Sequence, residues 1–342
     1  MAGRNALYDL IPALSKSVEI PIICVGNLTT GGTGKTPMVA YLAEYFHKHD
    51  LNVAILSRGY GRKEKKTSRL ITKTTAIDNS TAATLGDEIL MLHQQIPEAA
   101  LVLDGDRIRG AQTANQRLAP DLILMDDGFQ HRRLRRNLNL LMIDSQRLFG
   151  NRRLLPAGSL REPLKALKRA DIVVLNKFDQ RHPRFYSEAA EILNYISPQK
   201  LFYSSYYFRQ FTAADNSRSL NLDEIKDLGP LCACSGLANN NYFFAQLRSL
   251  GLQLEEVASF RDHYDYSEND LKKLIGMSQS RPMITTAKDA VKLKILAAEK
   301  APAFLKQLWI AEIGLKINHE ENFLKIFEPF IGSPNHIKPA HP

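Results

Sequence analysis

Cysteine is scarce in this chain, with three residues among 342. Three cysteines cannot form the disulfide framework of a small secreted domain, so we expect buried, reduced thiols. Cys232 and Cys234 have no second ligand cluster nearby, which argues against a zinc site. A run of about 18 apolar residues is also missing, as is a secretory signal, so no spanning helix or export is predicted. We therefore expect a cytoplasmic protein, or one that is peripheral on a membrane.

Acidic residues are fewer than basic ones, and 45 Lys and Arg against 36 Asp and Glu leave a net charge of +9. This excess favours an anionic partner, such as nucleotide phosphates, anionic lipid or nucleic acid. A nucleic-acid binder is disfavoured because no strand interleaves aromatic and basic residues. The hydrophobic content of 44% is ordinary for a globular protein, and the length predicts two domains.

A glycine-rich turn near the N-terminus organises the chain. The apolar run 20–25 predicts a buried strand, and residues 37–46 are apolar at helical spacing. Between them lies Thr29-Thr30-Gly31-Gly32-Thr33-Gly34-Lys35-Thr36. A strand, a glycine loop, Gly-Lys-Thr and a helix form the context of a P-loop, although Thr29 stands where the usual pattern begins with glycine.

The P-loop chemistry follows from its backbone. Glycines let successive N–H groups point into one hollow, and the helix N-terminus adds the positive end of its dipole. Lys35 is expected to reach the β- and γ-phosphates, and the Thr36 hydroxyl to bind Mg²⁺. The predicted nucleotide-binding residues are Thr29, Gly31, Gly32, Thr33, Gly34, Lys35 and Thr36.

Acidic residues occur at two further positions that suit phosphoryl transfer. The apolar strand 122–125 runs into Asp126-Asp127-Gly128, the Walker B arrangement in which a carboxylate holds magnesium. Asp87 and Glu88 follow Gly86 and open a helix, where they are either functional or simply partners of the helix dipole. Arginines that favour an anion site follow at positions 132, 133, 135, 136, 147, 152, 153 and 161.

Strands and helices alternate along both halves of the chain. The pattern predicts an α/β fold: a P-loop NTPase-like, mostly parallel sheet domain (1–203) and a second, smaller Rossmann-like domain (204–342). Residues 212–229 are predicted to be a polar linker, and 62–73 a solvated excursion. The second half has no glycine fingerprint, but His263 lies between Asp262 and Asp265 after a strand, where acid–base residues are often found.

Asn176-Lys177-Phe178-Asp179 supports a rival hypothesis. This sequence resembles the guanine-reading motif of P-loop GTPases, which would make the chain a switch protein. Those proteins also carry Asp-x-x-Gly after the Walker B strand, and here Met125 stands three residues before Gly128. A GTPase is therefore the minority hypothesis, and a preference for GTP over ATP would support it.

The ordered set of motifs resembles the tetraacyldisaccharide 4′-kinase family of lipid A biosynthesis. The resemblance spans about residues 20 to 295. It is carried by 25–36, Ser57-Arg58-Gly59-Tyr60-Gly61, Gly86-Asp87-Glu88, Asp126-Asp127-Gly128-Phe129-Gln130-His131, Leu155-Pro156-Ala157-Gly158, Arg161-Glu162-Pro163, Phe260-Arg261-Asp262-His263 and Thr285-Thr286-Ala287-Lys288-Asp289. Family members usually carry Glu where this chain has Ala287, and they usually begin with a longer apolar segment.

This resemblance implies transfer of the γ-phosphoryl group of ATP to the 4′-hydroxyl of a tetraacylated glucosamine disaccharide 1-phosphate. It implies that Asp87 is the base, paired with His263, and that Lys35 and Mg²⁺ neutralise charge. The metal ligands would then be Thr36, Glu88 and Asp126, and the sugar side would be lined by Tyr60, Asp127, Gln130 and His131. A monomer that acts on the lipid disaccharide at an anionic membrane surface is expected, without nucleic acid.

Overall fold

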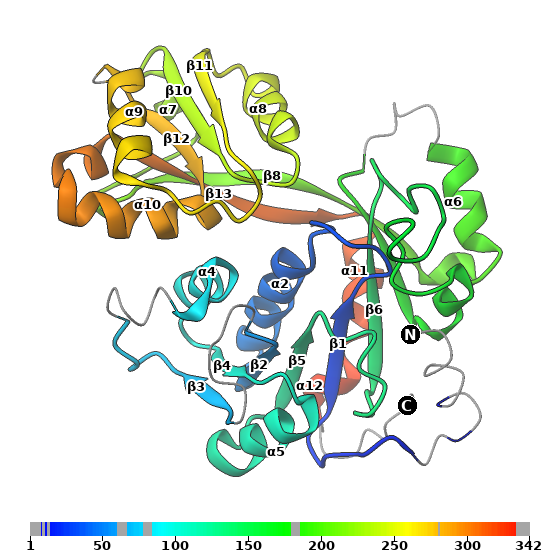
Figure 1. Ribbon diagram of the computed structural model, residues 1–342. Helices are drawn as coiled ribbons and strands as arrows, with labels where there is room; N and C mark the ends of the chain where they lie inside the picture. The colour runs from blue at the N-terminus through cyan, green and yellow to red at the C-terminus, as the bar shows by residue number, and fades with distance from the viewer. Residues whose placement is uncertain are drawn as a thin grey trace. The chain divides into compact units, whose positions relative to one another are not determined.

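Strand β1 (Ile22–Gly26) forms from the apolar run before the glycine-rich turn, and all its residues are buried. It belongs to a computed structural model that describes residues 8, 11, 14–59, 67–77, 84–178, 185–279 and 281–332 (Figure 1). The described residues divide into a first unit, which lies within 8–77, 84–206 and 315–332, and a second unit within 207–314.

The sheet of the first unit places β1 in its interior, between β5 and β6. Across the sheet the order is β8-β7-β6-β1-β5-β2-β4-β3, and the pairings are parallel except that of β3 with β4. The other strands are β2 (Val53–Ser57), β3 (Arg69–Ile71), β4 (Ala100–Leu103), β5 (Leu122–Asp126), β6 (Leu138–Asp144), β7 (Ile172–Asn176) and the start of β8 (Leu201–Ala213). Their parallel direction brings the carboxyl ends of β1, β2, β5, β6 and β7 to one edge, where α/β folds bind ligands.

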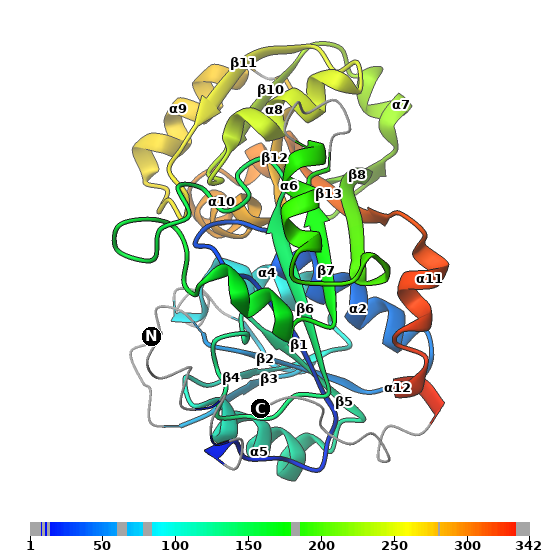
Figure 2. The same ribbon diagram turned by 90° about the vertical axis from the view of Figure 1, so that its right-hand side faces the viewer.

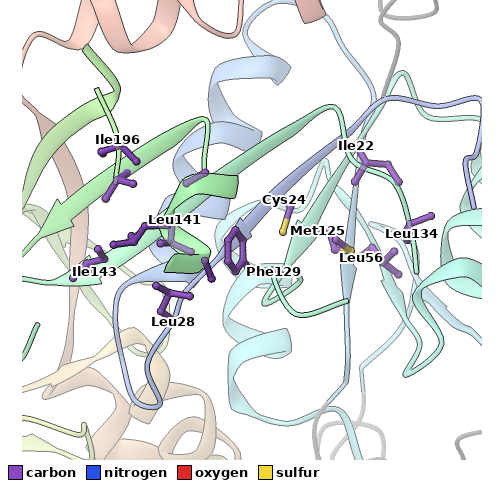
Figure 3. Packing of buried hydrophobic residues seen from close by; sticks show 14 of the residues in the cluster. Ile22, Cys24, Leu28, Leu56, Met125, Phe129, Leu134, Leu141, Ile143 and Ile196 are labelled. Atoms are coloured by element: carbon purple, nitrogen blue, oxygen red, sulfur yellow. The ribbon is translucent and has the colours of Figure 1, made fainter. Parts of the chain in front are cut away.

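Helices cover both faces of this sheet. The α-helices are α2 (Lys35–His47), α4 (Asp87–Gln95), α5 (Arg107–Leu118), α6 (Phe185–Leu193), α11 (Glu320–Lys325) and α12 (Pro329–Gly332), with 3₁₀ turns η2 (Leu164–Arg169) and η3 (Pro198–Lys200). Apolar residues of α5, η2 and α6 share one core with alternate strand residues, and Figure 3 shows Cys24, Met125 and Phe129 within it. Helix α2 packs on β1, β2 and β5 and also contacts α4.

The second unit is a smaller, mostly parallel sheet with helices on both faces. Its order is β11-β10-β12-β13-β8, and β9 pairs antiparallel with β8. Its strands are β9 (Ser219–Leu220), β10 (Leu231–Ser235), β11 (Leu254–Ser259), β12 (Met283–Thr286) and β13 (Leu308–Ile317). Its helices are α7 (Leu222–Lys226), α8 (Asn240–Ser249), α9 (Glu268–Ser278) and α10 (Ala287–Lys300), with the 3₁₀ turn η4 (Pro302–Lys306). One core contains side chains of α7 and α8, and the other contains side chains of α9 and α10.

The predicted α/β class is confirmed, and three details differ from expectation. Residues 212–229 are not a plain linker, because they contain β9 and α7, the latter begun by a capping box between Asn221 and Glu224. Within 62–73, Arg69–Ile71 adds an antiparallel edge strand. Residues 315–332 belong to the first unit, rather than to a domain 204–342, because Phe323 of α11 packs on Tyr41 of α2. Figure 2 shows α11 beside α2.

The three cysteines are buried, as the sequence predicted. Burial raises the pKa of Cys24 to about 11 and that of Cys234 to about 12, so neither thiol is ionised near neutral pH. These thiols therefore act as small apolar side chains. In the described part of the chain, no helix has both the length and the apolar character that crossing a bilayer requires.

Candidate active site

The glycine-rich turn has the geometry of a phosphate loop. Helix α2 begins at Lys35, and its N-cap, Gly34, has a φ of 93°, in the left-handed region that glycine adopts without strain. Among the described residues no side chain caps the first N–H groups of α2, which leaves these donors available to an anion. Thr33 is buried, and its hydroxyl accepts a hydrogen bond from Asn27 Nδ2 at 3.1 Å.

The predicted loop residues differ in how deeply they are buried. Thr29 is buried and forms a β-bridge with Leu160, so it anchors the start of the loop. Gly31, with a φ of 104°, and Gly32 are exposed, and Thr36 is buried in the first turn of α2. The Gly31-Gly32 pair therefore supplies the flexibility that the missing leading glycine usually provides.

Asp126 ends β5 and is almost entirely buried at 4% exposure. Burial and the charge of Glu88 raise its pKa to about 7, although Lys35 acts in the opposite direction. Ser57 Oγ lies 3.4 Å from Oδ2, and Oδ1 has no hydrogen-bond partner among the described residues. A buried carboxylate oxygen without a donor is suited to receive a cation.

Asp127 connects the P-loop to the acidic loop, by which we mean residues 126–131 at the end of β5. Lys35 Nζ lies 3.6 Å from Asp127 Oδ1, and Arg161 Nη1 donates to both carboxylate oxygens at 2.8 and 2.9 Å. Burial opposes ionisation of Asp127, but Lys35 and Arg161 together hold its pKa below the ordinary value. The side chain is therefore an anion that two cations hold at the C-terminal edge of the sheet.

Gln130 and Gly26 fix this acidic loop against β1. Gln130 is buried, and its Nε2 donates to the carbonyl of Asn27 at 2.9 Å. A Cβ on Gly26 would meet Phe129 Cβ at 2.5 Å, so only glycine allows this approach. His131 is half-buried, and its backbone N–H closes a turn onto Gly128. Gln130 and His131 thus lie directly after the Walker B carboxylates.

Asp87 and Glu88 occupy the first turn of α4. Asp87 is buried and accepts a hydrogen bond from the backbone N–H of Glu88 at 3.2 Å, whereas Glu88 is exposed. Carboxylates are favoured at the positive end of the helix dipole, which agrees with the explanation that Asp87 and Glu88 are simply dipole partners. However, the effect of Glu88 on the pKa of Asp126 shows that these two carboxylates are close enough to interact.

Two of the arginines expected at an anion site are inside the protein instead. Arg132 is 3% exposed and Arg136 is fully buried. Arg136 donates from Nε to Asn139 and from Nη1 to the carbonyl oxygen of His131, so it supports the loop rather than an external ligand. The charge pattern could not reveal this, because the burial results from packing of distant segments.

The arginines of the following segment have different surroundings. Arg152 and Arg153 are exposed, and Arg152 pairs with Glu191 at 2.7 Å. Arg147 is also exposed, and its guanidinium lies 3.6 Å from the position that a Cβ on Gly31 would occupy. Arg147 is therefore a cation beside the phosphate loop.

Sequence reasoning missed several residues that contact the site. The guanidinium of Arg107 is buried and donates to the carbonyl of Asp126 at 3.2 Å. Asn176 Nδ2 donates to the carbonyl of Thr33, and Lys177 Nζ donates to the carbonyl of Gly32, each at 3.0 Å. The Asn-Lys pair thus contacts the P-loop directly. Asp179, its last member, and Tyr60 lie outside the described residues.

His263 belongs to the second unit, in the turn after β11. Its φ is 57°, its imidazole is about half exposed, and Nε2 lies 3.9 Å from Asp262 Oδ1. Lys288 pairs with Asp262, and Lys292 donates to the carbonyl of Tyr264 at 2.9 Å. The turn that carries His263 is therefore held by lysines of α10.

The Thr-Thr-x-Lys-Asp motif, residues 285–289, lies next to this turn, and its last residue is a hydrogen-bond acceptor for neighbouring segments. Asp289 is buried and accepts hydrogen bonds from Thr286 Oγ1 at 2.6 Å, Tyr266 Oη at 2.9 Å and the Gly236 N–H at 2.9 Å. Position 287, where this chain has Ala, lies in the first turn of α10. The motif thus has a structural role in this unit.

The side chains predicted to bind a metal have donor atoms that suit magnesium. The Thr36 hydroxyl and the carboxylates of Glu88 and Asp126 are oxygen donors, which magnesium prefers, and the partnerless Oδ1 of Asp126 leaves a position for a cation. In the described part of the chain, no group of three or more His, Cys, Asp or Glu side chains could hold a metal ion by itself. Such a site fits an ion that arrives with phosphates, because magnesium usually keeps few protein ligands.

Comparison with known proteins is consistent with this geometry. The chain matches the family described as tetraacyldisaccharide-1-P 4′-kinase (LpxK) over residues 1–331. It is 38% identical over 293 residues to the tetraacyldisaccharide 4′-kinase of Aquifex aeolicus, covering 85% of each chain. It is 37% identical over 321 residues to that of Geobacter sulfurreducens, covering 89% of this chain and 86% of the relative.

A solved structure agrees with the sequence relatives. The crystal structure of the "apo" form of LpxK from Aquifex aeolicus in complex with ATP has a TM-score of 0.75 to this chain and 32% sequence identity. The similarity covers 96% of this chain and 94% of that chain. This chain therefore belongs to the tetraacyldisaccharide-1-P 4′-kinase family.

Proposed function

We propose that this chain transfers the γ-phosphoryl group of ATP to the 4′-hydroxyl of a tetraacylated glucosamine disaccharide 1-phosphate. The observation that carries this proposal is the convergence of the P-loop and the acidic loop, where Lys35 Nζ lies 3.6 Å from Asp127 Oδ1. Phosphoryl transfer is catalysed mainly by positioning and by neutralising charge. A lysine, buried carboxylates and uncapped helix N–H groups at one sheet edge supply both.

The P-loop side holds the nucleotide in this proposal. Backbone N–H groups of the glycines in the loop and of the first turn of α2 bind the phosphates, and Lys35 exchanges Asp127 for a phosphate oxygen. Magnesium would be held by Thr36, Glu88 and Asp126, and when bound it neutralises charge that develops on the transferred group. Arg147, beside Gly31, adds a further positive charge near the phosphates.

The acceptor side is assigned to the loops that follow the strands. Asp127, Gln130, His131 and Tyr60 line the sugar. Asp87 accepts the proton of the attacking hydroxyl, because its carboxylate sits on a helix N-terminus at the nucleotide edge. His263 pairs with Asp87 functionally and orients it or shares the proton. These roles rest on residue chemistry together with the family resemblance.

The direct test is ATP turnover by the full chain with and without a lipid disaccharide 1-phosphate acceptor. We expect turnover to require the acceptor, and chemical mapping to place the new phosphate on the 4′-hydroxyl. The same assay with GTP addresses the switch hypothesis. Acceptor-independent hydrolysis with a strong GTP preference would contradict the kinase proposal and support the switch.

We further propose that the exposed segment 152–155 contacts an anionic membrane surface. Arg152 and Arg153 are followed by Leu154 and Leu155, whose exposures are 37% and 47%. Exposed leucines beside arginines are typical of segments that enter the headgroup region. Arg132 and Arg136 cannot take part, because both are buried.

Liposome co-sedimentation tests this membrane contact. Each cation near an anionic bilayer contributes about 1 kcal/mol, screened by salt. We therefore expect binding to phosphatidylglycerol vesicles to weaken as salt rises, and to weaken further in Arg153→Ser and Leu155→Ser. Arg117→Ser, which changes an exposed arginine in the last turn of α5, is the matched control. Salt-independent binding, or none at low salt, would contradict this proposal.

A further inference from the structure

The Asn176-Lys177 pair sits where two strands end. Asn176 is the last residue of β7, and it lies in register with Asp144, the last residue of β6. Asn176 is fully buried, and Lys177 and Asp144 are 12% and 6% exposed. Lys177 Nζ donates to Asp144 Oδ2 at 2.6 Å while it also donates to the carbonyl of Gly32. A buried ion pair is thus joined to the phosphate loop.

The side chain of Asn176 also makes hydrogen bonds through both of its polar atoms. Its Oδ1 accepts a hydrogen bond from Ser204 Oγ at 3.0 Å, and its Nδ2 donates to the carbonyl of Thr33. Lys177 has a φ of 58°, a strained value for a residue with a Cβ, and its carbonyl accepts from Ser145 Oγ at 2.7 Å. Strain that the surroundings maintain is common at functional sites.

These contacts set the direction of the P-loop peptides. In a trans peptide the C=O and the following N–H point in opposite directions. Because Asn176 binds the Thr33 carbonyl, the Gly34 N–H points away from Asn176. A Cβ at Gly34 would meet Asn176 Nδ2 at 2.1 Å, so glycine is also required by the closeness of this contact. Asn176 and Lys177 therefore hold the loop by hydrogen bonds to its carbonyl groups.

We propose that Asn176, Lys177 and Asp144 form a latch that positions the P-loop for the triphosphate and does not read the base. The three residues are positioning residues, because they act on the phosphates through the carbonyl groups of Gly32 and Thr33. The inference rests on the proposed nucleotide binding at the P-loop and does not depend on the lipid acceptor. A hydrogen bond from a charged donor contributes enough to change affinity roughly tenfold or more.

The test measures binding of three probes to the full chain by calorimetry in Mg²⁺: ATP, GTP and inorganic tripolyphosphate. We expect Lys177→Met to raise the Kd of all three by a similar factor, roughly tenfold. Lys177→Arg should recover part of the loss, because the positive charge is retained. Lys165→Met, at an exposed lysine of the same unit, is the matched control and should change none of them.

Asp144→Asn provides a second variant of nearly unchanged shape. It removes the charge that holds Lys177, so it should also weaken tripolyphosphate binding. Breaking a buried ion pair also lowers the melting temperature, so binding is measured well below that temperature, where circular dichroism shows the variant folded. The Asp144→Asn/Lys177→Met double variant should lose little more than Lys177→Met alone, as for residues that act as a unit. Unchanged tripolyphosphate affinity in both single variants, or a loss confined to one nucleotide, would overturn the latch.

Failure of the kinase proposal gives a different result. A chain that binds triphosphate but transfers no phosphate to the disaccharide would contradict the proposed reaction and leave the latch supported by the affinity changes. A chain that binds none of the three probes would overturn both.

Discussion

Lys35→Ala is expected to lower kcat for phosphoryl transfer roughly 10²- to 10³-fold, the usual cost of removing one preorganised charge or donor from a transition state. Lys35 is the first residue of α2, and its side chain is 13% exposed where the P-loop meets the acidic loop. No other described lysine is assigned to the phosphates. The measurement is steady-state turnover with ATP and the lipid acceptor.

The fold should survive this substitution. Asp127, which loses Lys35 as a partner, keeps the two hydrogen bonds from Arg161, so no buried charge is left unpaired. Circular dichroism and the melting temperature should therefore match those of the unaltered chain. Lys48→Ala, at the exposed C-cap of the same helix, is the matched control and should keep full activity. Near-normal turnover by Lys35→Ala would refute the P-loop assignment.

Asp87→Ala and His263→Ala are each expected to slow the chemical step, by roughly 10²- to 10⁴-fold if general acid–base catalysis is lost. Removing both should cost little more than the worse single change, because residues that act as a unit are non-additive. The affinity for ATP should survive, since neither side chain is assigned to the phosphates. Single-turnover kinetics separate the chemical step from product release.

The comparison of single and double variants tests whether Asp87 and His263 act together. His47→Ala, at an exposed histidine in the last turn of α2, controls for the loss of an imidazole. Rate losses that multiply independently would show that Asp87 and His263 do not act as one unit. An unaffected His263→Ala would remove the second unit from catalysis and leave Asp87 as the only base candidate.

The strand, loop and helix of the P-loop segment could be predicted because their signals are local, and the binding roles of its residues remain predictions. The strand before Thr29, the glycines and the helix after Thr36 appear within a few consecutive turns of sequence, and each conformation depends on neighbouring residues. The same is true of Asp126 and Asp127, which directly follow an apolar strand. The roles of Asp87, Glu88, His263 and the sugar-side residues remain predictions.

The contacts around those motifs could not be predicted because they join residues far apart in the chain. Arg161 meets Asp127 across 34 positions, and Asn176 meets the Thr33 carbonyl across 143. The Asn-Lys pair resembles a base-reading motif in sequence. In the structure it lies at the end of β7, where it donates hydrogen bonds to the P-loop. The burial of Arg132 and Arg136 likewise depends on segments that pack over them.

The sequence by itself determined the α/β class, the strand–loop–helix arrangement of residues 22–47 and the family, because periodicity and backbone requirements are encoded over short spans. Only the tertiary structure decided which carbonyl and carboxylate groups accept hydrogen bonds, which arginines are exposed, and that residues 315–332 return to the first unit. Those outcomes follow from strand order and packing, in which β1 brings the ends of β5, β6 and β7 to the same edge. Neither strand order nor packing leaves a pattern in any single stretch of residues.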